Sequence, residues 1–215
     1  MSSSSKSADR RIRGDRLIEI LAVVLLGVAT LGSAWCGYQA SRWNGEEATL
    51  AREATDLRVE SSRLFGLATQ KVAYDSTIVA QYAQAYIDGN EKLITFYRST
   101  LIRPDFLPVI DQWEAQIAAG GGPPTNLFED SEYLDAQFAD YRAVDAKAEE
   151  ATAASAAAGE VSDDYVLNTL LFASALFFAG ITTSFRLTLP RLVLLAAAVL
   201  TIAYAASRVA TLDVT

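Results

Sequence analysis

Two charged residues, Lys71 and Asp75, interrupt an apolar helical pattern and are the first candidates for a functional site. Between residues 50 and 85, apolar and small residues recur every seven positions along two lines, which is typical of a coiled-coil seam. Lys71 lies on one line and Asp75 on the other, four residues apart and therefore on one helix face. We expect them to pair with each other, or with a neighbouring chain, and to set helix register. The alternative is a charged constriction through which something passes or binds.

A mixed aromatic and charged stretch follows, FYRSTLIRPDF at residues 96–106. Its charged residues are Arg98, Arg103 and Asp105. We expect this stretch to cap the tip of a helical domain, with Arg103 or Arg98 paired to a carboxylate so that the turn is ordered. A ligand pocket at the tip is the alternative, although pockets are few per protein.

Four polar residues lie in or beside the apolar runs of the chain, where charge is costly. Asn168 and Arg208 would lie near the same end of an antiparallel hairpin, so Arg208 would reach Asp164 or bond Asn168. Glu19 lies one turn inside a basic flank, and we expect it to pair with Arg16 or with the link 186–191.

Several kinds of chemistry have no residues to support them. Histidine is absent and Cys36 is the only cysteine, so the chain holds no intrachain disulfide and no Cys/His zinc site. No glycine-rich phosphate loop and no Ser/His/Asp set occurs. The formal net charge of −8 lacks the basic footprint of a nucleic-acid-binding protein. We therefore predict a non-enzyme that uses no cofactor or metal and binds no nucleic acid.

The elements that carry these residues begin with three apolar runs, at 17–38, 165–185 and 190–207. Each is about as long as a helix that crosses ~30 Å of hydrocarbon. Residues 41–162 have soluble composition, with 10 basic against 20 acidic residues. We predict an all-α membrane protein with three transmembrane helices and a long helical extracytoplasmic domain, coiled-coil or four-helix-like. The predicted segments are a disordered basic N-terminus (1–16), spans at 17–40, 163–185 and 192–210, the helical domain 41–162, the link 186–191 and the tail 211–215.

Basic residues set the expected orientation, because Lys and Arg are enriched in cytoplasmic flanks. Residues 1–16 hold five basic and two acidic residues, and the link 186–191 holds two basic residues and no acid. Both flanks are cytoplasmic if the N-terminus is inside, so 41–162 and the tail lie outside. The rival reading is a signal peptide cleaved after Ala34, but the apolar run exceeds the usual 7–15-residue core of such a signal.

Aromatic residues mark the edge of the first span. Trp35, Tyr38 and Trp43 fall where the chain should leave the lipid, and amphipathic rings prefer the headgroup level. We expect them to form an interfacial belt. The alternative makes Arg42, Trp43 and Asn44 a contact point for a partner.

The helical domain is expected to run out, turn and return. We predict that the first helix continues to Asp88-Gly89-Asn90, that shorter helices occupy 91–102 and 104–119, and that a loop covers 120–126. Pro104 would lie in the first turn of the second short helix, and 129–160 would return to the membrane. Ser162, Asp163 and Asp164 would then cap the second span. A four-helix bundle with a bend near Gly66 is the alternative.

Small residues recur every fourth position in all three runs, which allows close helix contact and favours self-association. These residues are Gly32, Cys36 and Ala40; Ala175, Ala179 and Thr183; Ala197, Thr201 and Ala205.

Three stretches carry a family resemblance: YQASRWNGEEA, FYRSTLIRPDFLP and DDYVLNTLLFASALFFAGIT. Over roughly residues 17–207 the chain resembles a family of uncharacterised bacterial membrane proteins with one N-terminal span, a helical extracytoplasmic region and a C-terminal pair of spans. The resemblance implies this topology and a bacterial inner-membrane location. It implies no catalytic or binding residue.

These patterns together predict a non-enzymatic integral membrane protein. Its helical domain would assemble with itself or with another envelope protein. One alternative is a homo-oligomeric ion channel or transport accessory, because the acidic domain would concentrate cations. Another is a membrane-bound sensor that signals through a partner.

Overall fold

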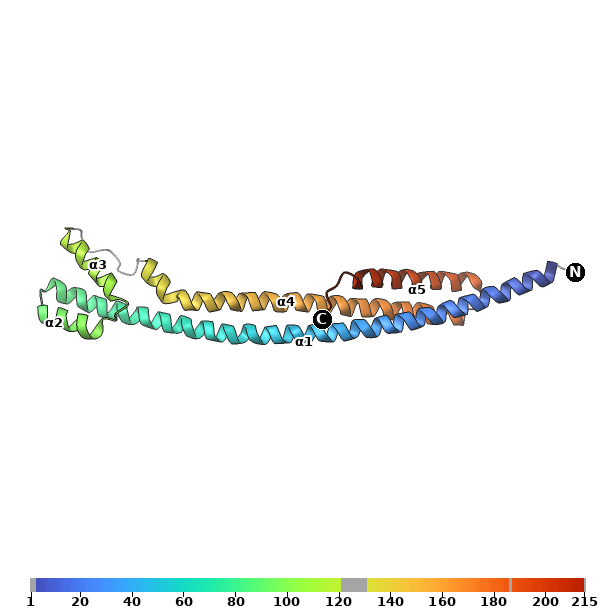
Figure 1. Ribbon diagram of the computed structural model, residues 1–215, viewed down its shortest axis with the longest axis horizontal. Helices are drawn as coiled ribbons and strands as arrows, with labels where there is room; N and C mark the ends of the chain where they lie inside the picture. The colour runs from blue at the N-terminus through green and yellow to red at the C-terminus, as the bar shows by residue number, and fades with distance from the viewer. Residues whose placement is uncertain (1–2, 121–130, 186, 215) are drawn as a thin grey trace. The chain divides into compact units, whose positions relative to one another are not determined.

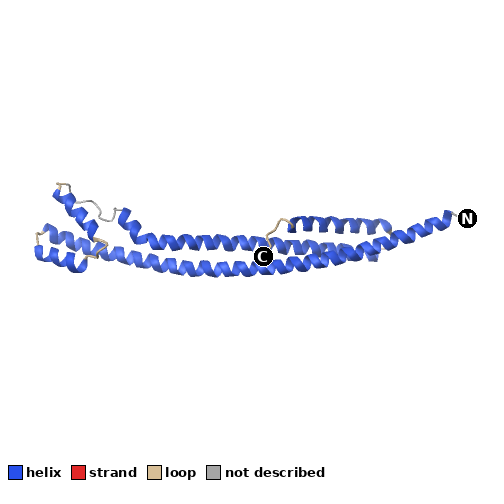
Figure 2. Ribbon diagram, viewed as in Figure 1, coloured by secondary structure: helices blue, strands red, loops and turns tan. Residues whose placement is uncertain are grey.

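The computed structural model describes residues 3–120, 131–185 and 187–214, and within them the protein is all-helical with no strand (Figures 1 and 2). The prediction of an all-α fold is confirmed. The helices are α1 (Ser3–Ile87), α2 (Glu91–Phe96), α3 (Leu107–Ala118), α4 (Ser131–Ile181) and α5 (Thr188–Val209), joined by a π-helical turn η1 (Tyr97–Leu101) and a 3-10 turn η2 (Thr182–Ser184).

Helix α1 is long because nothing in its sequence stops it before residue 88. It contains no proline, and it continues through Gly66, where the alternative fold required a bend. Its end is the one predicted: Gly89 adopts a left-handed φ of 66°. The N–H of Asn90 donates to the carbonyl of Ala85 at 3.0 Å, which closes the helix with a Schellman-type turn. The side chain of Asn90 then accepts from the N–H of Leu93 and starts α2.

The helix expected at 91–102 is present as α2 followed by the π-helical turn η1, which ends at Leu101. Two other predicted boundaries were wrong. Pro104 lies in the turn before α3, and it is Pro108 that lies in the first turn of that helix. Residues 162–164 do not cap a helix but lie inside α4, because α4 continues through Gly159 without a break. Most of the predicted loop 120–126 lies outside the described residues.

The chain divides into two compact units, Met1–Ala51 with Thr152–Thr215 (unit 1), and Arg52–Ala151 (unit 2). Unit 1 contains the first part of α1, the second part of α4, and α5, which lie side by side (Figure 1). Unit 2 contains the rest of α1 and α4 together with α2, η1 and α3. The predicted functional residues are therefore divided between the two units.

Small residues let the helices of unit 1 approach closely. Cys36, Ala175 and Ala205 are fully buried in its largest apolar cluster. A Cβ added to Gly32 would lie 2.7 Å from the ring of Phe172, so only glycine fits there without a shift. The four-residue steps of small residues are thus largely used for packing inside the unit, and they no longer argue for self-association.

The large apolar side chains of unit 1 point outward. Exposed residues include Leu31 on α1, Leu170 and Phe177 on α4, and Leu200 on α5. Within the described residues, three helices are long and apolar enough to cross a membrane: the one containing the first run, α4 and α5. An apolar surface of this kind suits hydrocarbon rather than water.

Unit 2 contains a core that is rich in aromatic side chains. Tyr82, Phe106, Ile110, Trp113 and Tyr133 are all buried in one cluster. Of the two predicted seam lines on α1, one is fully buried throughout, at Ala54, Ser61, Ala68, Asp75 and Tyr82. The other line, which starts at Leu50, is only half-buried before Ile78. The seam is therefore deepest on the line that carries Asp75.

Candidate functional site

The carboxylate of Asp75 lies at the centre of a polar network in unit 2, and its side chain is 1% exposed. Arg103 reaches it from the turn before α3, with Nε 3.0 Å from Oδ1 and Nη2 2.5 Å from Oδ2. The hydroxyl of Tyr133, near the start of α4, also donates to Oδ2. One buried carboxylate thus joins α1, the turn before α3, and α4. Such forked pairs are the strong class of protein hydrogen bonds.

The same arginine is held by two further acceptors. Its Nη1 lies 2.8 Å from a carboxylate oxygen of Asp105, and its Nη2 lies 3.4 Å from the side-chain oxygen of Gln137. The hydrogen bonds to Asp75 raise the pKa of the Arg103 guanidinium further above its usual range. Burial, followed by the hydrogen bond to Asp75, raises the pKa of Tyr133. The Arg103 guanidinium therefore stays charged, and the Tyr133 hydroxyl stays protonated, at neutral pH.

Arg98, in η1, is the centre of a second polar network of unit 2. Its guanidinium pairs with Asp111 and, at 3.1 Å, with Glu114, both on α3. Glu114 also accepts a hydrogen bond from the hydroxyl of Tyr82 on α1. Burial, with a smaller effect from the bond to Glu114, raises the pKa of Tyr82 to about 12. Both arginines of the predicted cap thus pair with carboxylates, as expected for a cap.

Lys71 does not take part, contrary to the expected pairing with Asp75. It is exposed, whereas Asp75 turns to Arg103 and Tyr133. The reason is burial: Asp75 is buried at its position on α1, whereas Lys71 is exposed. A buried carboxylate requires a geometrically good partner, and the planar fork of Arg103 presents two parallel donors to one carboxylate, which a lysine ammonium does not.

A cleft of about 290 Å³ lies beside the Arg103 network, between α3 and the start of α4. It is lined by polar and apolar side chains: Asp105, Pro108, Val109, Gln112, Glu132, Tyr133, Ala136 and Gln137. Three of its five polar lining residues, Asp105, Tyr133 and Gln137, already belong to the network. Among the described residues, no group of three or more His, Cys, Asp or Glu side chains could hold a metal ion. The network is therefore organised as a clasp that joins three elements.

A cluster of aromatic rings lies on the outside of unit 2, and the sequence reasoning missed it. Phe65 on α1 is 48% exposed. Its ring centroid lies 5.7 Å from that of Phe138 and 5.2 Å from that of Tyr141, both on α4. Phe65 falls outside both seam lines, and the alanine-rich sequence of α4 hid the matching face. We call Phe65, Phe138 and Tyr141 the aromatic patch.

The three predicted belt residues in unit 1 divide into two kinds. Trp35 and Tyr38 are 47% and 55% exposed, and their ring centroids are 6.1 Å apart. Trp43 is half-buried, and its indole Nε1 donates to the backbone carbonyl of Asp213 at 3.1 Å. The hydroxyl of Tyr165 donates to the same carbonyl at 3.0 Å. Trp43 therefore anchors the segment after α5, a contact that the sequence did not reveal.

The polar residues beside the apolar runs also find partners. Arg208 on α5 pairs with Asp164 on α4 at 2.5 Å, the first of its two expected partners. Asn168 is fully buried, and its Nδ2 donates to the carbonyl of Asp164 at 2.8 Å, one turn earlier in α4. Glu19 lies 4.0 Å from Arg191, at the end of the link 186–191. Each of these contacts joins neighbouring turns or helices of unit 1.

The chain matches no protein-family model, no curated protein and no solved structure. The resemblance noted from the sequence therefore stays a prediction, and function has to be argued from the two units themselves.

Proposed function

We propose that this protein is a non-enzymatic membrane anchor, whose unit 2 lies outside the cytoplasm and assembles with a second copy or with another envelope protein. The aromatic patch carries this proposal. Aromatic residues are enriched in interfaces and are frequent among the residues that dominate binding energy. Phe65 packs against Phe138 and Tyr141 inside the unit, yet its side chain remains 48% exposed, so a large part of this ring is available to a partner.

The membrane part of the proposal rests on unit 1. Three helices are apolar enough to cross a bilayer, and their outward faces carry large apolar side chains. The basic flanks favour a cytoplasmic N-terminus, and the family resemblance implies a bacterial inner-membrane location. In this orientation the acidic unit 2 lies on the far side of the membrane.

The clasp around Asp75 supports a binding role for unit 2 rather than a reactive one. The Asp75 carboxylate already accepts three hydrogen bonds from Arg103 and Tyr133. Buried pairs of this kind stabilise one packing arrangement when every group is bonded. We infer that the clasp holds α1 and α4 together, so that the patch is presented on a preformed surface.

Site-specific photocrosslinking in native membranes tests the proposal. A photoreactive amino acid at Phe65 should give crosslinks to a second copy or to one discrete partner, which mass spectrometry then identifies. The matched control is the same photoreactive amino acid at Arg63, which is exposed. Because successive helix residues are rotated by about 100°, Arg63 lies on nearly the opposite side of α1 from Phe65. Equal crosslinking from both positions, or none from Phe65, would show that the patch is not an interface.

The orientation has a separate test. A protease site inserted after Thr125 should be cleaved from the extracytoplasmic side in intact cells whose outer membrane has been made permeable. Cleavage only after the inner membrane is opened would overturn the topology. The crosslinking result from Phe65 would still stand.

A further inference from the structure

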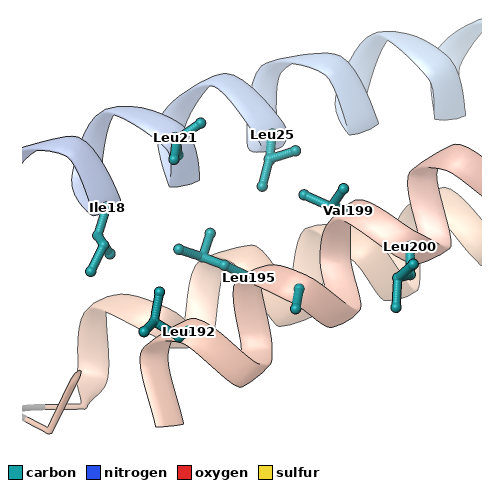
Figure 3. A pocket seen from close by; sticks show the side chains of 8 residues that line it. Ile18, Leu21, Leu25, Leu192, Leu195, Val199 and Leu200 are labelled. Atoms are coloured by element: carbon teal, nitrogen blue, oxygen red, sulfur yellow. The ribbon is translucent and has the colours of Figure 1, made fainter. Parts of the chain in front are cut away.

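An apolar groove runs along unit 1 between α1 and α5 (Figure 3). Its volume is about 440 Å³, within the range of ~300–1,000 Å³ typical of small-molecule sites. Ile18, Leu21 and Leu25 line it from α1, and Leu192, Leu195 and Val199 line it from α5. Ile18 and Leu195 are buried at its floor, whereas Leu21 and Leu192 are more than half exposed at its walls. The groove is therefore open along one side.

One end of the groove is positively charged. Arg191 immediately precedes the lining residue Leu192, and its side chain is only 12% exposed. Arg16, two residues before Ile18, is exposed. Among the described side chains at this end, Glu19 is an acidic group, and it lies 4.0 Å from Arg191. In the sequence, residues 1–19 and 186–191 together hold seven basic and three acidic residues.

The start of α5 adds a partial positive charge at the same end. The first turn of a helix presents free backbone N–H groups and the positive end of the helix dipole. At Leu187, the residue before α5, no side chain caps these N–H groups. Arg191 lies in this first turn.

We propose that this groove binds one anionic phospholipid, with an acyl chain along the leucines and the phosphate at Arg16, Arg191 and the start of α5. Basic pockets between transmembrane helices on the cytoplasmic side are known to bind anionic headgroups. A neutral lipid would fill the apolar groove equally well, and so the charge at one end selects the anionic class. The inference rests on the membrane anchoring proposed above, but not on the aromatic patch.

Native mass spectrometry of the full-length protein, released from nanodiscs of equal phosphatidylglycerol and phosphatidylcholine, tests the site. We expect one phosphatidylglycerol to be retained in preference to phosphatidylcholine. Each arginine near an anionic surface contributes about 1 kcal/mol, or roughly fivefold in affinity. Arg16→Gln should therefore reduce the preference roughly fivefold, whereas Arg142→Gln in unit 2 should leave it unchanged.

Filling the groove tests the acyl-chain half of the proposal. Leu195→Trp should abolish retention of the lipid. Because Leu195 is buried and this variant could fail to fold, Leu200→Trp is the second variant: Leu200 lines the groove but is 70% exposed. Loss of retention in the folded Leu200→Trp protein supports the site.

Three results would overturn the inference. The first is equal retention of both lipids, and the second is an unchanged lipid preference in Arg16→Gln. The third is a dimer that Leu200→Trp separates without loss of bound lipid, which would show that a second copy fills the groove. Failure of the membrane anchoring itself is distinguishable, because an unanchored protein would be extracted from membranes by alkaline carbonate.

Discussion

Replacing Arg103 with leucine is the sharpest test of the clasp in unit 2. The substitution leaves the Asp75 carboxylate, 1% exposed, without its forked partner, while the Tyr133 hydroxyl remains. Removing one partner of a buried ion pair typically costs about 3–5 kcal/mol, because an uncompensated charge stays buried. For a domain of this size, 1 kcal/mol shifts Tm by about 4–8 °C. We therefore expect Arg103→Leu to lower the Tm of unit 2 by more than about 10 °C.

Two further variants separate the buried charge from the loss of a side chain. Arg142→Leu is the matched control, because the Arg142–Asp135 pair is exposed and such pairs contribute about 0–1 kcal/mol. The double variant Asp75→Leu/Arg103→Leu leaves no charge unpaired at the centre. It should recover a large part of the loss, since apolar replacement of a whole buried pair is often neutral.

Circular dichroism melting of the full-length protein in mild detergent gives the Tm, and hydrogen exchange of peptides from unit 2 locates the effect. If Arg103→Leu melts within about 2 °C of Arg142→Leu, the reasoning is refuted. The Asp75 carboxylate would then be solvated, or neutral, in the folded protein. A double variant that is less stable than Arg103→Leu would equally contradict the assignment of the cost to an unpaired charge.

Three other predictions follow from contacts of single side chains. Gly32→Ala should destabilise the detergent-purified protein by about 1–3 kcal/mol, because the new Cβ meets a ring at 2.7 Å; Gly37→Ala, with nothing within 4 Å, should not. Because the pKa of Tyr82 is raised, its hydroxyl contributes fully to stability below pH 10, and this contribution is lost as the pH rises through about 12. Tyr82→Phe should therefore remove one late transition from the ultraviolet titration of the tyrosines. An unchanged titration would contradict the burial of Tyr82. Trp43→Phe with Tyr165→Phe removes both donors to one backbone carbonyl, so the residues after α5 should exchange hydrogen faster, and exchange equal to the wild type would disprove the anchor.

The local features of this protein could be predicted from its sequence. The three apolar runs, the helical class and the end of α1 at Asp88-Gly89-Asn90 depend on the composition and hydrogen bonding of neighbouring residues. The seven-residue step on α1 likewise identified the buried line that contains Asp75. In each case the pattern that allows the prediction is contained in a continuous stretch of the chain.

Only the tertiary structure decided which residues act together. Asp75 pairs with Arg103, 28 residues away, rather than with Lys71, four residues away. Trp43 bonds Asp213, 170 residues away, although its sequence position indicated an interfacial belt. The pattern on a helix face predicts which residues are buried, but it does not identify their partners, because many polar side chains can form the required hydrogen bonds. The choice among them was made by the packing of α3 and α4 against α1 in unit 2, and of α4 and α5 against α1 in unit 1.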